Sequence, residues 1–108
     1  MKNAHWLLAC ALLLTGCFLP AGAGPTGILR KEEAKPVIAA LENYYKAQQS
    51  YPTDLKALVP DYLENTPKHI SYSREGASYN LIFEYASSYM NMCTYTPLAG
   101  KWNCIGYY

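Results

Sequence analysis

Few side chains in this chain of 108 residues are of the types that carry out acid–base or nucleophilic chemistry. His69 could serve as a general base, but a base needs a nucleophile and an orienting partner close in space. Ser71 and Ser73 follow it, yet neither lies in a Gly-x-Ser-x-Gly motif. Phosphate-binding loops, dinucleotide-binding motifs and runs of metal ligands are also absent from the sequence. We therefore predict that the protein is not an enzyme and has no cofactor or metal, with His69 solvated at a strand edge.

The composition predicts a folded domain rather than a disordered or nucleic-acid-binding chain. Hydrophobic residues make up 51% and aromatic residues 14% of the sequence, whereas disordered segments contain few of either. Nine basic side chains against eight acidic ones leave no positive excess for phosphate contacts, so we expect no nucleic-acid partner. The length allows one domain at most.

The first residues indicate export. An apolar run from Trp6 to Leu14 is shorter than the ~20 residues that cross a bilayer, and it has the length and flanks of a signal peptide. The run ends in LTGC, which resembles the bacterial lipobox. The resemblance implies that residues 1–16 are a signal peptide and that Cys17 carries a diacylglycerol. The alternatives are an ordinary signal peptide cut within residues 21–23, with a chance cysteine, or an uncleaved membrane anchor.

The predicted lipid would hold the protein on a bacterial membrane. Several acyl chains on one residue give stable attachment, whereas one chain gives only marginal attachment. Removal of residues 1–16 would leave eight basic side chains against eight acidic ones, so attraction to anionic lipids is not the expected anchor. In the lipoprotein family, an aspartate after the lipidated cysteine is associated with the inner membrane. Phe18 stands there instead, which favours the outer membrane of the cell envelope.

Two cysteines remain after Cys10 leaves with the signal peptide and Cys17 takes lipid. An even number of cysteines in an exported chain indicates a disulfide between Cys93 and Cys104. If residues 92–96 and 102–107 are the arms of a hairpin, these two cysteines lie directly opposite each other. Zinc binding needs more ligands at close spacing than the chain supplies.

The predicted elements form an α+β layer arrangement. Residues 17–30 contain several glycines, prolines and alanines, and we expect a lipidated N-terminus and a flexible linker there. A long helix is predicted from Lys31 to Gln49, with Pro36 close to its first turn because proline deeper inside would break it. Four segments with strand character follow: 70–72, 79–85, 92–96 and 102–107. The prediction is one long N-terminal helix packed on a three- to four-stranded antiparallel sheet, over residues 31–108.

Residues 39–60, AALENYYKAQQSYPTDLKALVP, resemble the globular half of type IV pilins and type II secretion pseudopilins. In that family a helix ends in a similar signature and leads through a loop into an antiparallel sheet, and a disulfide near the C-terminus is frequent. The long apolar helix that builds the filament core has no counterpart after Cys17. The acidic calcium ligands of the major pseudopilin are also unmatched. The resemblance therefore implies a pilin-like fold and not assembly into a filament.

The aromatic residues provide the candidate binding surface. Eleven tyrosines and Trp102 are too many to bury in a domain of this size, and exposed rings offer large contact areas at low entropic cost. The candidates lie on or beside the predicted sheet: Tyr72, Tyr89, Tyr95, Trp102 and Tyr107. The alternative is that they are ordinary strand residues, since aromatics favour strands. We expect a protein-binding or accessory module of an envelope secretion or pilus system; the alternative is a lipoprotein that binds glycan or peptidoglycan through these rings.

Overall fold

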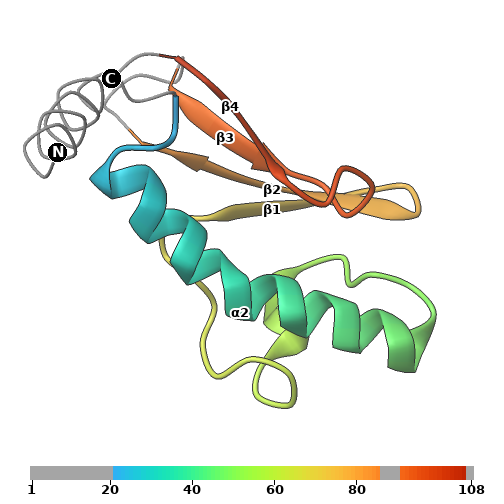
Figure 1. Cartoon of the computed structure of the whole chain (residues 1–108). Helices are drawn as coiled ribbons and strands as arrows, with labels where there is room; N and C mark the ends of the chain where they lie inside the picture. Colours follow the sequence, from blue (N-terminus) through green and yellow to red (C-terminus); the bar gives the residue numbers. More distant parts are fainter. Residues whose placement is uncertain (1–20, 86–90, 107–108) are drawn as a thin grey trace, which may run out of the picture.

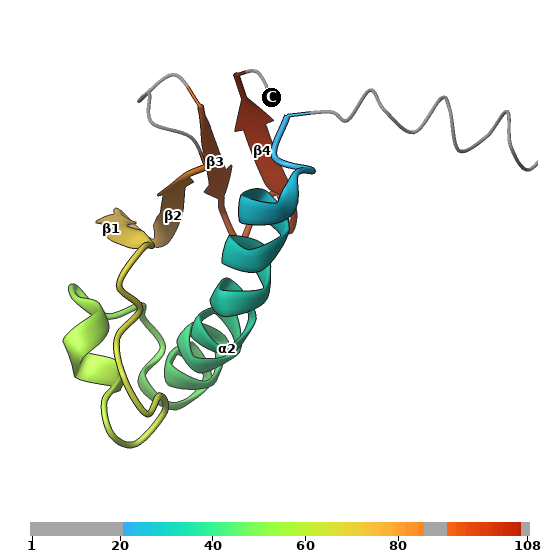
Figure 2. The same cartoon turned by 90° about the vertical axis from the view of Figure 1, so that its left-hand side faces the viewer.

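A computed structural model describes residues 21–85 and 91–106. The described elements are a long helix, one turn of 3-10 helix and four strands: α2 (Pro25–Gln48), η1 (Leu55–Leu58), β1 (Ser71–Glu75), β2 (Ser78–Glu84), β3 (Met92–Tyr95) and β4 (Trp102–Ile105). The strands form one antiparallel sheet in the order β1-β2-β3-β4. Helix α2 crosses one face of this sheet (Figures 1 and 2). The predicted α+β class, with a helix packed on an antiparallel sheet, is confirmed.

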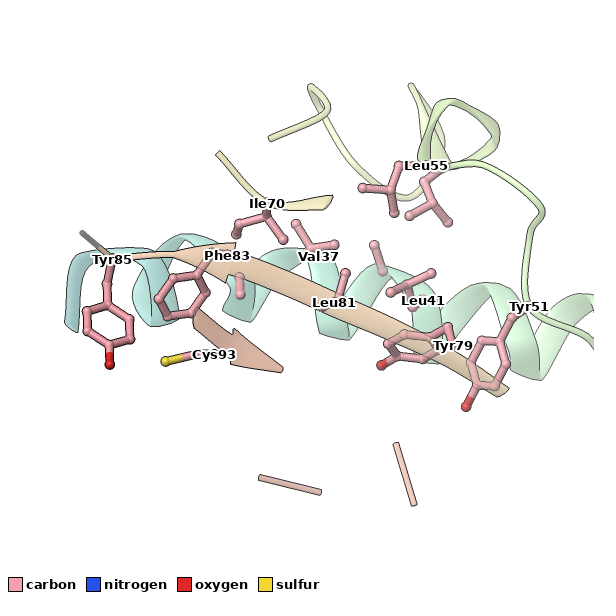
Figure 3. Close-up of a cluster of buried hydrophobic side chains, with 13 residues drawn as sticks. Val37, Leu41, Tyr51, Leu55, Ile70, Tyr79, Leu81, Phe83, Tyr85 and Cys93 are labelled. Atoms are coloured by element: carbon pink, nitrogen blue, oxygen red, sulfur yellow. The ribbon is translucent and has the colours of Figure 1, made fainter. Parts of the chain in front are cut away.

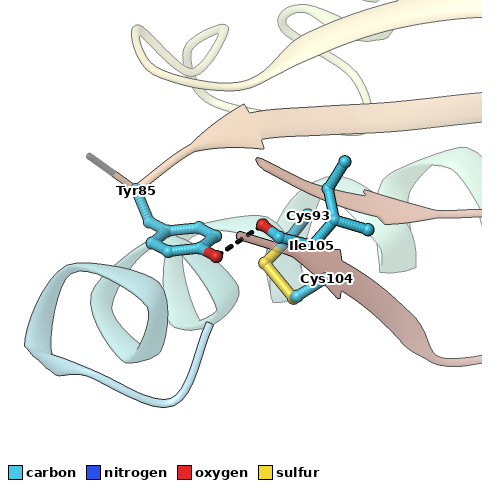
Figure 4. The surroundings of a disulfide bond; sticks show 4 residues. All are labelled: Tyr85, Cys93, Cys104 and Ile105. Carbon is cyan, nitrogen blue, oxygen red and sulfur yellow. Dashed lines mark hydrogen bonds between the residues drawn. A yellow bond between two sulfur atoms is a disulfide. The ribbon is translucent and has the colours of Figure 1, made fainter. Parts of the chain in front are cut away.

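The predicted C-terminal hairpin is also confirmed. Tyr95 pairs with Trp102, and Cys93 pairs with Cys104, with 4.0 Å between the two cysteine Cα atoms. A disulfide joins the two cysteines. Beside it, the hydroxyl of Tyr85 at the end of β2 donates a hydrogen bond to the carbonyl oxygen of Ile105 (Figure 4). Two links therefore tie β4 to the rest of the sheet at this end.

The start of the helix differs from the prediction. Helix α2 begins at Pro25, six residues before Lys31, so residues 25–30 are helical rather than part of a flexible linker. Pro25 suits the first helical position because its missing N–H would have no partner there. Pro36 lies inside the helix, and its predicted place in the first turn is wrong. Ala34 and Val37, before and after the proline, are buried in the core, and their packing stabilises the helix across this position.

The core fills the space between α2, the sheet and the segment that connects them (Figure 3). Side chains from one face of β2 and from the helix meet there, and all described buried side chains are apolar or aromatic. The largest fully buried ones are Tyr79, Phe83, Leu41, Leu58, Leu81, Val37 and Cys93. Residues 51–70 close one side of this core through Leu55, Leu58 and Ile70. The helix and the sheet are thus held together by a single apolar cluster.

The segment before the helix packs on the disulfide. Gly22 has a φ of 77°, and a Cβ added there would overlap the sulfurs of both Cys93 and Cys104. A Cβ on Gly27 would overlap the carbonyl group of Gly22. Only glycine allows the chain to approach the disulfide this closely. The contact fixes the position of the first turn of α2 relative to β3 and β4.

We expect Gly22→Ala to lower the free energy of unfolding by about 2–4 kcal/mol, from left-handed backbone strain plus overlap with the two sulfurs. Gly76→Ala is the matched control, because Gly76 also has a positive φ, of 58°, but has no atoms within 4 Å of an added Cβ. The control should lose only the strain, about 1–2 kcal/mol. Urea unfolding of both variants measures the difference. Equal losses would contradict the packing of Gly22 on the disulfide.

Candidate functional site

Three of the predicted binding aromatics lie on the helix side of the sheet. Tyr72, Tyr95 and Trp102 stand in register with Leu81, which is fully buried, so they share its face. All three are partly buried and pack against the core. The hydroxyl of Tyr72 donates to the carbonyl oxygen of Pro52. Their positions fit the alternative in which these rings are strand residues that support the core.

Three further predicted sites lie outside the described residues: the lipidation site Cys17 and the aromatic residues Tyr89 and Tyr107. His69 is exposed, as expected, and precedes β1. It lines a surface cavity of about 350 Å³ together with Arg30, Lys68 and Ser71. In the part of the chain that the structure describes, no hydrogen bond joins His69 to Ser71.

Metal binding finds no support in residues 21–85 and 91–106, where no group of three or more histidine, cysteine or acidic side chains is close enough to hold an ion. The same residues contain no helix with the length and apolar character needed to span a bilayer.

A continuous series of aromatic rings runs through the molecule from the core to the surface. Tyr45 and Tyr51 have ring centroids 4.7 Å apart, and Tyr51 is 4.7 Å from Tyr79 in an edge-to-face contact. Tyr79 in turn neighbours Tyr95, which packs at 5.4 Å on Trp102. The series reaches solvent at Tyr45, which is 39% exposed. Aromatic pairs in these geometries stabilise the core beyond the area they bury.

At this exposed end lies a cavity of about 470 Å³, which we call the tip cavity. Its lining comes from three separate parts of the chain. Helix α2 and the segment after it contribute Glu42, Tyr45 and Tyr51, the β1–β2 hairpin contributes Glu75, and the β3–β4 turn contributes Leu98. Leu98 is 95% exposed. Figure 1 shows both turns and the C-terminal end of α2 at the end of the molecule opposite the start of this helix.

Two acidic side chains, Glu42 and Glu75, line the tip cavity. The hydroxyl of Tyr51 donates to the carboxylate of Glu42, at 3.0 Å and 3.3 Å from its two oxygens. Burial, followed by this hydrogen bond, raises the pKa of Tyr51 to about 12. A tyrosine hydroxyl is protonated at neutral pH in any case, and the raised pKa lets the hydroxyl of Tyr51 keep donating at a more alkaline pH. Among the described residues, neither Glu42 nor Glu75 has a basic side chain within ion-pair distance; the described pairs join Arg30 to Glu33 and Lys35 to Glu32.

Sequence reasoning did not identify the tip cavity. Glu42 and Tyr45 are three residues apart on a helix, which places them on one face. Nothing in the sequence indicates that Glu75 and Leu98 meet that face, because this depends on how the two hairpins end. Comparison with protein-family models, curated proteins and solved structures finds no match to this chain. The geometry of the described residues is therefore the basis for any functional assignment.

Proposed function

We propose that this protein is a lipid-anchored module of the bacterial cell envelope that binds another protein, as an accessory of a secretion or pilus system. The proposed anchor is the lipid on Cys17, at the end of the lipobox-like LTGC. The proposed pilin-like character of the domain is supported by the element order, in which a long helix precedes an antiparallel sheet with a C-terminal disulfide. The pilin-like signature at residues 39–60 covers the end of that helix and the segment after it.

The observation that carries the proposal is the position of the tip cavity. Helix α2 has 24 residues and, at about 1.5 Å per residue, is ~36 Å long. A chain anchored before residue 21 would hold the tip cavity at the far end of this helix, away from the membrane surface. The exposed Leu98 and Tyr45 beside the cavity supply the apolar and aromatic groups that anchor protein interfaces.

Glycan binding through the sheet aromatics has weaker support. Flat sugar rings stack on free aromatic faces, whereas Tyr95 and Trp102 pack on each other and on the core. The tip cavity instead exposes Tyr45 beside the almost fully exposed Leu98. An aromatic and an aliphatic side chain together suit contact with another protein better than stacking on a sugar ring.

In-cell photo-crosslinking tests the proposal. A photoreactive amino acid replaces Leu98, and a matched chain carries it at Ser71, which is exposed and lines the cavity at the other end of the sheet. We expect a defined envelope protein to be attached through position 98 and not through position 71, with Cys17→Ser losing both palmitate and the crosslink. Equal capture at both positions, or capture at neither, would overturn the proposal.

A further inference from the structure

We propose that the tip cavity receives a cationic side chain, arginine or lysine, from the segment of the partner that docks there. This inference rests on the proposed function, because it names the chemistry by which the protein partner is held. It is carried by the charge of the cavity, by its aromatic wall and by the apolar residue at its rim.

The charge of the cavity is one-sided. Among the described residues, its lining includes two carboxylates, Glu42 and Glu75, and no lysine, arginine or histidine. The nearby Arg74 donates to the carbonyl oxygen of Tyr51, at 3.3 Å, and is not part of the lining. Two carboxylates that line one cavity, from a helix and from a hairpin, with no basic partner among the described residues, are complementary to an incoming cation. Glu42 is already held in position by the hydroxyl of Tyr51.

The wall and the rim suit the rest of such a side chain. The rings of Tyr45 and Tyr51 are inclined by 33° to each other and both line the cavity. Cations are attracted to the faces of aromatic rings, and the planar guanidinium group of arginine stacks on them. Leu98, almost fully exposed at the rim, offers an apolar contact for the methylene groups that carry the charge. Carboxylate, ring and apolar contact thus match the three parts of one side chain.

The cavity at the other end of the molecule lacks this selectivity. Arg30 and Lys68 line it together with Glu84, so charges of both signs are present. Arg30 is also paired with Glu33 at 2.7 Å. An ion of either sign would meet repulsion as well as attraction there, and we assign no ligand to that cavity.

A pair of tripeptides tests the inference on the full chain in detergent micelles. The probes are acetyl-Ala-Arg-Ala-amide and the same peptide with citrulline, which has the shape of arginine without its charge. Binding is followed by NMR through the ring protons of Tyr45 and the amide of Ala77, which also lines the tip cavity. We expect the arginine peptide to shift these signals and the citrulline peptide to bind about tenfold more weakly.

Two variants test whether the arginine peptide binds in the tip cavity. Glu42→Gln and Glu75→Gln should each weaken arginine binding about three- to tenfold, since each removes one charged partner. Glutamine at position 42 can still accept the hydrogen bond from Tyr51, so the fold is preserved. Glu64→Gln is the matched control, because Glu64 is an exposed carboxylate that does not line the tip cavity. This control should bind as the unmodified chain does.

The outcomes separate this inference from the proposed function. Equal binding of both peptides, or unchanged binding by both tip variants, would overturn the cationic ligand while leaving crosslinking at position 98 intact. Loss of that crosslink in Glu42→Gln and Glu75→Gln, but not in Glu64→Gln, would support both. A crosslink that fails at position 98 in the unmodified chain overturns the proposed function, whatever the peptides do.

Discussion

Replacement of both Cys93 and Cys104 by serine should lower the free energy of unfolding by about 3 kcal/mol. The disulfide closes a loop with a sequence separation of 11, and the chain-entropy account gives roughly that stabilisation for a loop of this size. Its removal has a second consequence, because Gly22 packs on both sulfurs. The first turn of α2 should therefore lose its contact with the sheet as well.

Urea unfolding of the double variant measures the loss, and hydrogen exchange at the amides of residues 28–30 reports on the first turns of α2. Reduction of the unmodified chain should give the same loss, which makes it the internal control. Tyr85→Phe removes the neighbouring hydrogen bond to Ile105 and keeps the disulfide, so it should cost only about 1 kcal/mol. A double variant as stable as the oxidised chain would show that the disulfide does not support the fold.

Substitutions of Tyr79 should change stability in opposite directions. Tyr79 is fully buried against Tyr51, Tyr72 and Tyr95, so Tyr79→Ala should cost about 3–5 kcal/mol through the cavity it leaves. Its hydroxyl is buried without a hydrogen-bond partner among the described residues, and burial raises its pKa. An unsatisfied buried polar group costs about 1–3 kcal/mol. Tyr79→Phe should therefore increase stability by about 1 kcal/mol.

Tyr51→Phe is the matched control for this change, because the Tyr51 hydroxyl donates to Glu42. The same chemical change should there lower stability by about 1 kcal/mol. Thermal unfolding followed by circular dichroism compares the variants at neutral pH. A loss of stability in Tyr79→Phe would mean that the hydroxyl has a partner in solution, and the opposite signs expected for the two positions would not be seen.

The C-terminal hairpin could be predicted from the sequence in detail. Cys93 and Cys104 lie on the two arms of one hairpin, with a sequence separation of 11. A single register therefore places the cysteines opposite each other and also pairs Tyr95 with Trp102. Those pairs are present. The alternation of Tyr79, Leu81 and Phe83 likewise indicated the buried face of β2, which the structure confirms. Short-range pairing and a period of two are local properties, and local sequence is sufficient to specify them.

The start of the helix could not be predicted in the same way. Residues 21–30 contain several glycines and a proline, which are typical of a linker. Proline suits the first position of a helix, but it is equally common in linkers, so Pro25 alone does not mark a helix start. Glycine is needed at positions 22 and 27 because the residues before α2 pack closely against both the helix and the disulfide. That requirement exists only once β3 and β4 have paired. Packing against the rest of the molecule thus overrides the local composition.

By itself, the sequence determined the α+β class, the hairpin register and the disulfide, because hydrophobic period and cysteine spacing act over short stretches of chain. Only the tertiary structure decided that Tyr72, Tyr95 and Trp102 face the helix and that Glu42, Glu75 and Leu98 surround one cavity. These residues are far apart in the chain. They meet because the length of α2 and the lengths of the two hairpins bring the end of the helix and both turns to the same end of the molecule.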